Sequence, residues 1–450
     1  MSKMGGVNSG KNALLTLFIK SFYFILTFVI GVIVARAIGP EGKGIYSLIL
    51  LTSSIGAVIV GLGVPVSNSC LVGKHMEHPA LAVNEKTSSL ATNSLLLIIG
   101  VIILLACIYA SLQFSKIFEP TTLKYVGIAF VVIPFLLLIS LFAELLHGMN
   151  KILEFNLVLV FVPLLQLIVL LTLIKGLTLS AVLMSWAISQ IIGVGIVSFI
   201  LFKNTKVGVP DFSLLKSMLA FGLQVWGVQL IGALNLRFDT YLVAYYLGAE
   251  DVGYYSVAVT IANFLFYIPS SIAIVILPRL TSSDSKTASD MACRGLRVSI
   301  FSSALLLILF MGIGKFIIPA VYGKMFIPSI VPLFILLPGS AIFGLAHITT
   351  TYFNAYIGKP IINTGLASLS LVINIGLNVV LIPKFGVNGA ALSCTISYIL
   401  SMMVSIYIFL RLSKVRLNEL LSIRIADIRE YLRILREVRP HGTLNKHSKL

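Results

Sequence analysis

Residues 94–112 read SLLLIIGVIILLACIYASL, a run of 19 positions without a charged side chain. Residues 125–143 and 155–174 form two more runs of this kind. A helix needs about 20 apolar residues to cross roughly 30 Å of hydrocarbon. Because the runs have this length and carry no charge, they predict transmembrane α-helices.

The composition of the whole chain is that of a membrane protein. Hydrophobic residues make up 58% of the 450 positions and charged residues only 11%, whereas soluble domains carry about 25% charged residues. The net charge of +17 raises nucleic acid as a partner. The Lys and Arg residues, however, flank the apolar runs or gather after residue 410, a pattern that orients membrane proteins. With no soluble basic face carrying stacking aromatics, the sequence predicts no nucleic-acid partner.

Runs of this length predict an all-α, polytopic membrane protein with about twelve transmembrane helices. The expected spans are 14–38, 45–71, 89–113, 125–146, 154–174, 178–202, 219–247, 253–280, 297–321, 330–353, 361–382 and 387–411. If the N-terminus is cytoplasmic, most Lys and Arg residues lie on the cytoplasmic side. This bias predicts that both termini are cytoplasmic, which requires an even number of spans.

An internal repeat divides the predicted spans into two sets of six. Residues 37–47 (AIGPEGKGIYS) match residues 246–256 (YLGAEDVGYYS) at an offset of 209. The pairs include Gly44 with Gly253 and Tyr46 with Tyr255. Since six spans return the chain to the same side, the halves are predicted to be parallel around a central cavity, as in transporters. We expect six-helix bundles at 1–207 and 208–412, followed by a basic, amphipathic cytoplasmic tail at 413–450.

Several motifs resemble those of a known family. They are Ala35–Ser47 (ARAIGPEGKGIYS), Arg237–Tyr241 (RFDTY), Val252–Ser256 (VGYYS), Gly358–Pro360 (GKP) and Gly386–Ala391 (GVNGAA). In this order they resemble the bacterial polysaccharide-biosynthesis membrane proteins, the oligosaccharide flippases of the multidrug/oligosaccharidyl-lipid/polysaccharide exporter superfamily. The resemblance covers roughly residues 10–412, and the basic tail is longer than the family pattern suggests.

The resemblance implies a V-shaped pair of six-helix bundles and a non-enzymatic function in the bacterial inner membrane. The implied activity is the transfer of undecaprenyl-pyrophosphate-linked oligosaccharide across the bilayer for surface polysaccharide, O-antigen or capsule synthesis, with polymerases or glycosyltransferases as further partners. One alternative is a drug or metabolite exporter of the same superfamily. Another is a membrane glycosyltransferase or polymerase, although no predicted outward loop is long enough for such a catalytic site.

Two ionisable residues lie within the seventh predicted span, where charges are costly and usually face a cavity or a partner. Arg237 is expected to bind substrate phosphate through its planar fork of donors. Asp239 is the candidate for coupling transport to an ion gradient. A structural ion pair or a helix contact is the alternative for both, although residues at i and i+2 do not face each other on a helix.

Three further polar residues are candidate substrate-binding groups. Lys20 lies in the first span, and it either reaches the cavity or extends to the cytoplasmic interface. Gln229 occupies the equivalent repeat position at the offset of 209, and Asn235 lies near Arg237. Amides between helices are as often packing groups as binding groups. His347 is interpreted as a packing residue because no second ligand lies at i+3 or i+4, and we predict neither a metal site nor a cofactor.

Overall fold

A computed structural model describes residues 4–75, 80–115, 120–173, 176–203, 205–282 and 284–421. These residues form helices without a strand, so the predicted all-α fold class is confirmed. The α-helices are α1 (Met4–Gly61), α2 (Val64–His75), α3 (Ala80–Ser115), α4 (Pro120–Gly148), α5 (Ile152–Thr172), α6 (Leu179–Phe202), α7 (Phe212–Leu247), α8 (Ala249–Ala262), α9 (Tyr267–Ser282), α10 (Ser285–Val321), α11 (Ile330–Gly344), α12 (Ala346–Thr351), α13 (Ile361–Phe385), α14 (Val387–Ser413) and α15 (Leu417–Leu421). Short 3₁₀ or π segments join some of them at Asn263–Phe266, Lys324–Ser329 and Tyr352–Tyr356.

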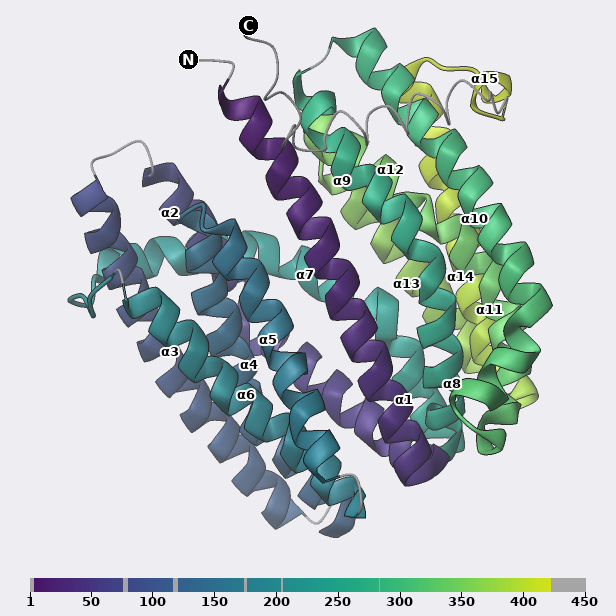
Figure 1. The fold of residues 1–450 in the computed structure, drawn as a ribbon, viewed down its shortest axis with the longest axis horizontal. Helices are drawn as coiled ribbons and strands as arrows, with labels where there is room; N and C mark the ends of the chain where they lie inside the picture. Colours follow the sequence, from purple (N-terminus) through teal and green to yellow (C-terminus); the bar gives the residue numbers. More distant parts are fainter. Residues whose placement is uncertain are drawn as a thin grey trace, which may run out of the picture.

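The described residues contain 11 helical stretches that are long and apolar enough to cross a membrane. One of them, Phe18–Gly61, has 44 residues and is interrupted at Gly39, whose φ of 67° and ψ of −175° are not helical. This backbone conformation favours glycine because it lacks a Cβ, and the chain turns back there (Figure 1). The two arms of α1 correspond to the first two predicted spans, which accounts for the expected twelve. The predicted tail falls mostly at 422–450, outside the described residues.

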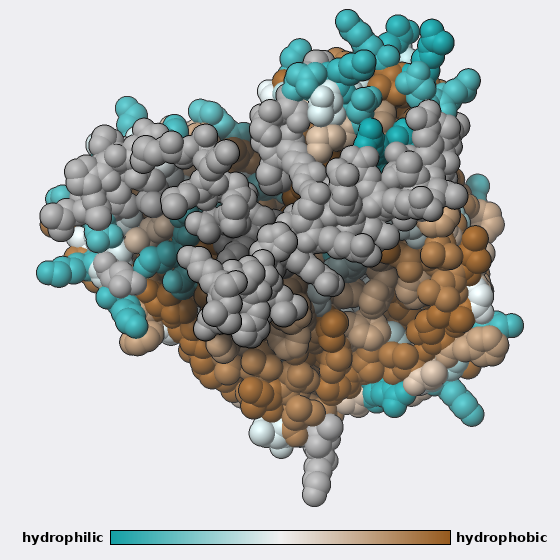
Figure 2. All heavy atoms as spheres, turned by 45° about the horizontal axis from the view of Figure 1, so that its top comes forward, coloured by the Kyte–Doolittle hydropathy of each residue, from teal (hydrophilic) through white to brown (hydrophobic). Residues whose placement is uncertain are grey.

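The helices form two groups that meet at one end of the molecule (Figure 1). Helices α2 to α6 lie on one side, α8 to α14 lie on the other, and α1 runs between them. On the face that Figure 2 shows, brown apolar side chains form a broad area, and teal hydrophilic residues lie beyond it towards the edges of the molecule. Such an apolar area suits a protein surrounded by lipid.

Two glycines allow the groups to meet at what we call the closed end, formed by residues 39–44 and 248–253. A Cβ on Gly44 would lie 1.7 Å from the carbonyl oxygen of Ala249, and a Cβ on Gly253 would lie 2.0 Å from that of Pro40. Each contact repeats the other at the offset of 209, so the sequence repeat is also a repeat of contacts. Small residues of this kind let membrane helices approach closely.

Arg36 adds a polar contact at the closed end. Its Nε donates to the carbonyl oxygen of Val321 at 2.7 Å, and its Nη2 donates to that of Ala320. Both carbonyls belong to the last turn of α10, where backbone acceptors are unpaired and a cation is favoured. The side chain therefore ties α1 to the second group of helices.

Helix α7 contacts both groups (Figure 1). In its first half, the indole of Trp226 donates to the carbonyl oxygen of Val58 at 3.0 Å, and Gly222 packs against the backbone of Leu62. In its second half, Asp239 bonds to Tyr255 of α8. The helix that follows the predicted boundary at 207/208 is thus shared, and the division into two domains remains a proposal.

The connection before α7 is held by Asn93 of α3. The Nδ2 of Asn93 donates to the carbonyl oxygen of Asp211 at 2.8 Å, while its Oδ1 accepts the backbone N–H of Asp211 at 3.2 Å. Asp211 in turn caps the start of α7 through bonds from Ser213 and Leu214. The amide therefore fixes the point at which α7 begins.

Asn93→Ala is expected to lower the free energy of unfolding by about 1–3 kcal/mol, because partly buried backbone groups of Asp211 lose their partners. The melting temperature of the purified protein in detergent measures the effect. Ser111→Ala on the same helix is the control, since that exposed hydroxyl bonds to the Ile108 carbonyl one turn away and to no other described residue. Equal melting temperatures for the two variants would contradict the assigned role of Asn93.

Candidate functional site

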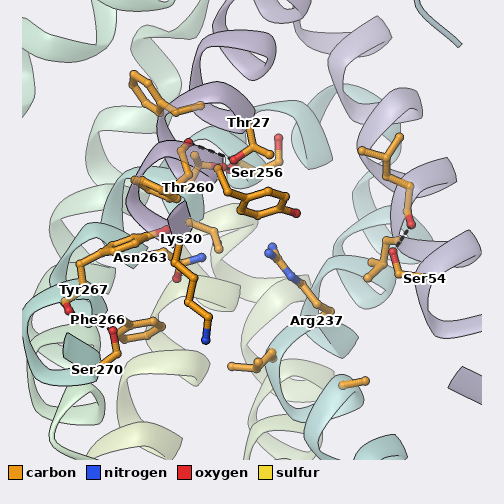
Figure 3. Close-up of a pocket in the computed structure, with 18 of the residues that line it drawn as sticks. Lys20, Thr27, Ser54, Arg237, Ser256, Thr260, Asn263, Phe266, Tyr267 and Ser270 are labelled. Carbon is orange, nitrogen blue, oxygen red and sulfur yellow. Dashed lines mark hydrogen bonds between the residues drawn. The ribbon is translucent and has the colours of Figure 1, made fainter. Parts of the chain in front are cut away.

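A cavity of about 990 Å³ lies between the two groups of helices. Its walls come mainly from both arms of α1 and from α7, α8 and α9. Arg237 projects from α7 into this space, and Lys20 of α1 lies on the facing side with Asn263 and Thr260 (Figure 3). The cavity begins beside the closed end, at Lys43, and extends along α1 as far as Ile19.

The charged side chains lining this cavity are all cationic. Lys20, Lys43 and Arg237 belong to the lining, and no Asp or Glu is found among the described residues that line it. Lys43 and Arg237 lie within electrostatic range of each other. Lys20 is exposed and lies within range of His147 and His347. Such a cavity attracts an anion, because fields add where low-dielectric walls surround charges of one sign.

Hydroxyl groups and aromatic rings make up much of the remaining lining. The Oγ1 of Thr260 donates to the carbonyl oxygen of Ser256 at 2.7 Å within α8. The Thr260 hydroxyl oxygen can therefore still accept a hydrogen bond from a ligand. The rings of Phe24 and Tyr267 stand 4.0 Å apart between centroids. A mixture of hydroxyls and flat apolar rings suits a ligand that is polar along its edges and apolar on its faces.

A smaller cavity of about 300 Å³ adjoins the first, and Arg237 and His347 line both. Asp239 lines the smaller one and is only 5% exposed. Its Oδ2 accepts the Tyr255 hydroxyl at 2.5 Å, and its Oδ1 accepts the Thr240 backbone N–H at 2.7 Å. Asn235 lines the same cavity, and its Oδ1 is buried without a hydrogen-bond partner among the described residues.

The structure brings four of the five predicted site residues together. Lys20 and Arg237 line the larger cavity, and Asn235, Arg237 and Asp239 line the smaller one. Gln229 is part of neither lining, so its role remains a prediction without geometric support.

Two lining residues were not recognised from the sequence. Lys43 falls between the predicted spans 14–38 and 45–71, where a loop residue is expected, whereas the structure buries it in the cavity wall. His347 was interpreted as a packing residue, whereas its ring lines both cavities. The repeated motif at residues 37–47 indicates that the region around Lys43 matters for the fold, but it does not indicate the direction of the Lys43 side chain. In the described part of the chain, no cluster of three potential metal ligands occurs.

The fold and the cavity define a polytopic membrane transporter. The family described as polysaccharide biosynthesis protein matches residues 9–284, and the chain belongs to this family. The structure resembles an inward-facing multidrug resistance MATE family transporter of the MOP superfamily with a TM-score of 0.72 at 14% identity, covering 89% of this chain and 98% of that one. It resembles the lipid II flippase MurJ in an inward closed conformation with a TM-score of 0.72 at 16% identity, covering 96% of this chain and 94% of that one.

Two relatives share sequence similarity with the chain. A protein of Shigella flexneri named "Putative O-antigen transporter" is 24% identical over 406 residues, which cover 85% of this chain and 93% of the relative. A Haloferax volcanii protein named "Probable low-salt glycan biosynthesis flippase Agl15" is 26% identical over 222 residues, covering 48% of this chain and 44% of that protein.

Proposed function

We propose that this chain is a flippase that moves lipid-linked oligosaccharide across the bacterial cytoplasmic membrane for surface polysaccharide synthesis. The substrate class is an oligosaccharide joined to undecaprenyl by a diphosphate. Both termini lie on the cytoplasmic side in this proposal, and the closed end faces outward. The protein catalyses no covalent step, and polymerases or glycosyltransferases are its candidate partners.

The observation that carries the proposal is the charge of the larger cavity. Three cations and no described carboxylate line a space whose other walls are hydroxyls and aromatic rings. A diphosphate carries the opposite charge, and guanidinium and ammonium groups are its usual protein ligands. The hydroxyl groups of the opposite wall suit a sugar. Membership of the polysaccharide biosynthesis family supports the same substrate class.

Export and release follow from the arrangement of the two helix groups. Lys20, on the arm of α1 nearer the N-terminus, makes the first electrostatic contact with the diphosphate. Arg237 on α7 then holds it deeper in the cavity. Release on the outer side requires residues 39–44 and 248–253 to separate, as alternating access by two parallel repeats demands.

The charge of the cavity also distinguishes the alternatives. A drug exporter for cationic compounds needs acidic groups facing its ligand, and the described lining of the larger cavity contains none. A glycosyltransferase or polymerase needs acid or base groups beside a solvent-filled site. Asp239, the carboxylate next to the cavity, is already bonded to Tyr255 and Thr240.

Arg237→Met is expected to reduce export of surface polysaccharide at least about tenfold, because a hydrogen-bonded charge contact to the substrate is lost. In cells that lack the protein, lipid-linked oligosaccharide should accumulate on the cytoplasmic leaflet, and the variant should fail to reverse this. Arg411→Met is the control, since Arg411 lies at the end of α14 against the ring of Tyr407. Normal surface polysaccharide in cells without the protein would falsify the proposed function.

A further inference from the structure

The chain turns at the end of α14 and folds back onto α10, at the end of the molecule away from the closed end (Figure 1). The turn is made by Lys414, whose φ of 58° and ψ of 20° are left-handed. This conformation often ends a helix, although glycine or asparagine usually occupies it. Residues 415 and 416 then lead into the short helix α15, which packs against α10.

The position of α15 is fixed by a buried arginine and a buried leucine. The Nη1 of Arg297, on α10, donates to the backbone carbonyl oxygen of Glu419 at 2.9 Å, and the Arg297 side chain is only 8% exposed. Backbone carbonyl groups in the last turn of a helix lack partners within the helix, and a cation is favoured there. Leu420 is 1% exposed and belongs to an apolar cluster with Leu296 and Cys293 of α10. Helix α15 is therefore a packed part of the fold.

The charge pattern places α15 at the edge of the hydrocarbon region. Residues 298–314 of α10 carry no charged side chain, and residues 385–410, which include most of α14, carry none either. Arg297 and Arg411 are the first charges beyond these two runs, at the same end of the molecule. Uncharged runs of this length mark the part of a helix that lies in lipid. Because α15 bonds to Arg297, it lies at the level of the lipid headgroups.

The outward side of this corner combines cations with exposed apolar side chains. Lys414 and Arg416 are exposed, and neither forms an ion pair with a carboxylate of the described residues. Leu417 is 49% exposed and Leu412 is 39% exposed. Exposed leucines are costly in water, whereas at a membrane surface they enter the boundary between headgroups and acyl chains. Cations beside them favour anionic, phosphate-bearing headgroups.

We infer that Lys414, Arg416 and Leu417 form a docking surface for anionic phospholipids of the cytoplasmic leaflet. The choice of leaflet follows from the orientation proposed above, whereas the binding itself does not depend on transport. None of the three residues lines either cavity. Residues 422–450 contain seven Lys or Arg and three Asp or Glu, so the chain beyond α15 adds charge of the same sign. Since α15 packs against α10, bound lipid holds the second group of helices at the leaflet surface.

Lipid binding can be measured on the purified full chain in detergent by native mass spectrometry. The probes are phosphatidylglycerol, phosphatidylcholine with the same acyl chains, and soluble glycerol phosphate. The double variant Lys414→Gln/Arg416→Gln should weaken binding of phosphatidylglycerol about 10- to 30-fold, because each cation near an anionic lipid surface contributes roughly fivefold. Its binding of phosphatidylcholine should stay unchanged. Leu417→Ser should weaken binding of both lipids about threefold, because an apolar contact with the acyl chains is lost.

The matched control is Lys315→Gln/Lys324→Gln, which removes two exposed cations near the other end of α10. This variant should bind phosphatidylglycerol like the unmodified chain. The charge-preserving variant Lys414→Arg/Arg416→Lys should do the same.

Arg297→Met tests whether the position of α15 matters. The variant leaves both exposed cations in place and removes the bond to the Glu419 carbonyl oxygen. It should weaken binding of phosphatidylglycerol about fivefold, with the melting temperature in detergent recorded to confirm that the protein is still folded. Unchanged binding by a folded Arg297→Met protein would show a mobile basic segment and overturn the docking surface.

Three further outcomes would overturn the inference. The first is equal affinity of Lys414→Gln/Arg416→Gln and of the control for phosphatidylglycerol. The second is binding of glycerol phosphate as tight as that of phosphatidylglycerol, since the surface would then take a free anion. The third is equal binding of the two lipids by the unmodified chain, which would assign the surface to a soluble protein partner. None of these results bears on export, so the proposed function is decided separately by Arg237→Met.

Discussion

Gly253→Ala is expected to abolish export while the protein still inserts into the membrane. The added Cβ would lie 2.0 Å from the carbonyl oxygen of Pro40. That oxygen belongs to the backbone, so it cannot rotate away, and residues 39–44 must separate from residues 248–253. Gly44→Ala should have the same effect, since its Cβ would lie 1.7 Å from the carbonyl oxygen of Ala249. Overpacking of this kind typically costs about 1–3 kcal/mol.

The matched controls are Gly100→Ala and Gly376→Ala. Both glycines are helical, and neither would place a Cβ within 4 Å of another group. Alanine is the better helix former by about 1 kcal/mol, so these variants should keep or gain stability. The same chemical change thus has opposite consequences at the two kinds of position.

The state of the closed end can be followed through Ser47→Cys, whose position lines the cavity near that end. A thiol reagent that does not cross membranes should label this cysteine from the outside faster when Gly253→Ala is present. Full export together with unchanged labelling would show that the close glycine contact does not hold the two helix groups together.

The positions of the spans were readable because membrane helices are marked by long apolar runs. The predicted spans at 361–382 and 387–411 correspond to α13, Ile361–Phe385, and α14, Val387–Ser413. The ends were less accurate where a helix extends beyond the apolar run. Helix α10 begins at Ser285 rather than at 297, because its first turns are polar. Apolarity reports the part of a helix in lipid, not the whole helix.

The candidate site could be predicted only in part from the sequence. A sequence shows where along a membrane span a residue lies, but not whether its side chain points into a cavity. Arg237 and Asp239 stood out because a charge within an apolar run is costly wherever it points. Lys43 follows a Gly–Pro turn and therefore resembled a loop residue, although the second arm of α1 resumes directly after Gly39. Gln229 and Asn235 are both polar residues of the same predicted span, so the sequence does not distinguish them. The direction in which each side chain leaves α7 places Asn235 in a cavity wall and Gln229 outside both cavities.

Asp239→Asn is expected to remove the dependence of transport on an ion gradient and to leave binding of the lipid-linked substrate largely intact. Asparagine keeps the shape of the side chain and an oxygen for the Thr240 backbone N–H, which Asp239 accepts at 2.7 Å. It lacks the charge that the buried carboxylate brings to the smaller cavity. Charge within a membrane is retained where function requires it, and we therefore propose Asp239 as the coupling residue.

The measurement is substrate translocation in proteoliposomes with and without an imposed proton or sodium gradient. Translocation by the unmodified chain should become faster when the correct gradient is applied. Translocation by Asp239→Asn should have the same rate with and without the gradient, and that rate should be about tenfold below that of the unmodified chain with the gradient. Asp290→Asn on the exposed start of α10 is the control.

Tyr255→Phe removes the hydroxyl whose hydrogen bond Asp239 accepts at 2.5 Å, and it should change the gradient response without abolishing it. A gradient response in Asp239→Asn equal to that of the unmodified chain would assign coupling to another residue, because no charge would then remain at position 239 to respond.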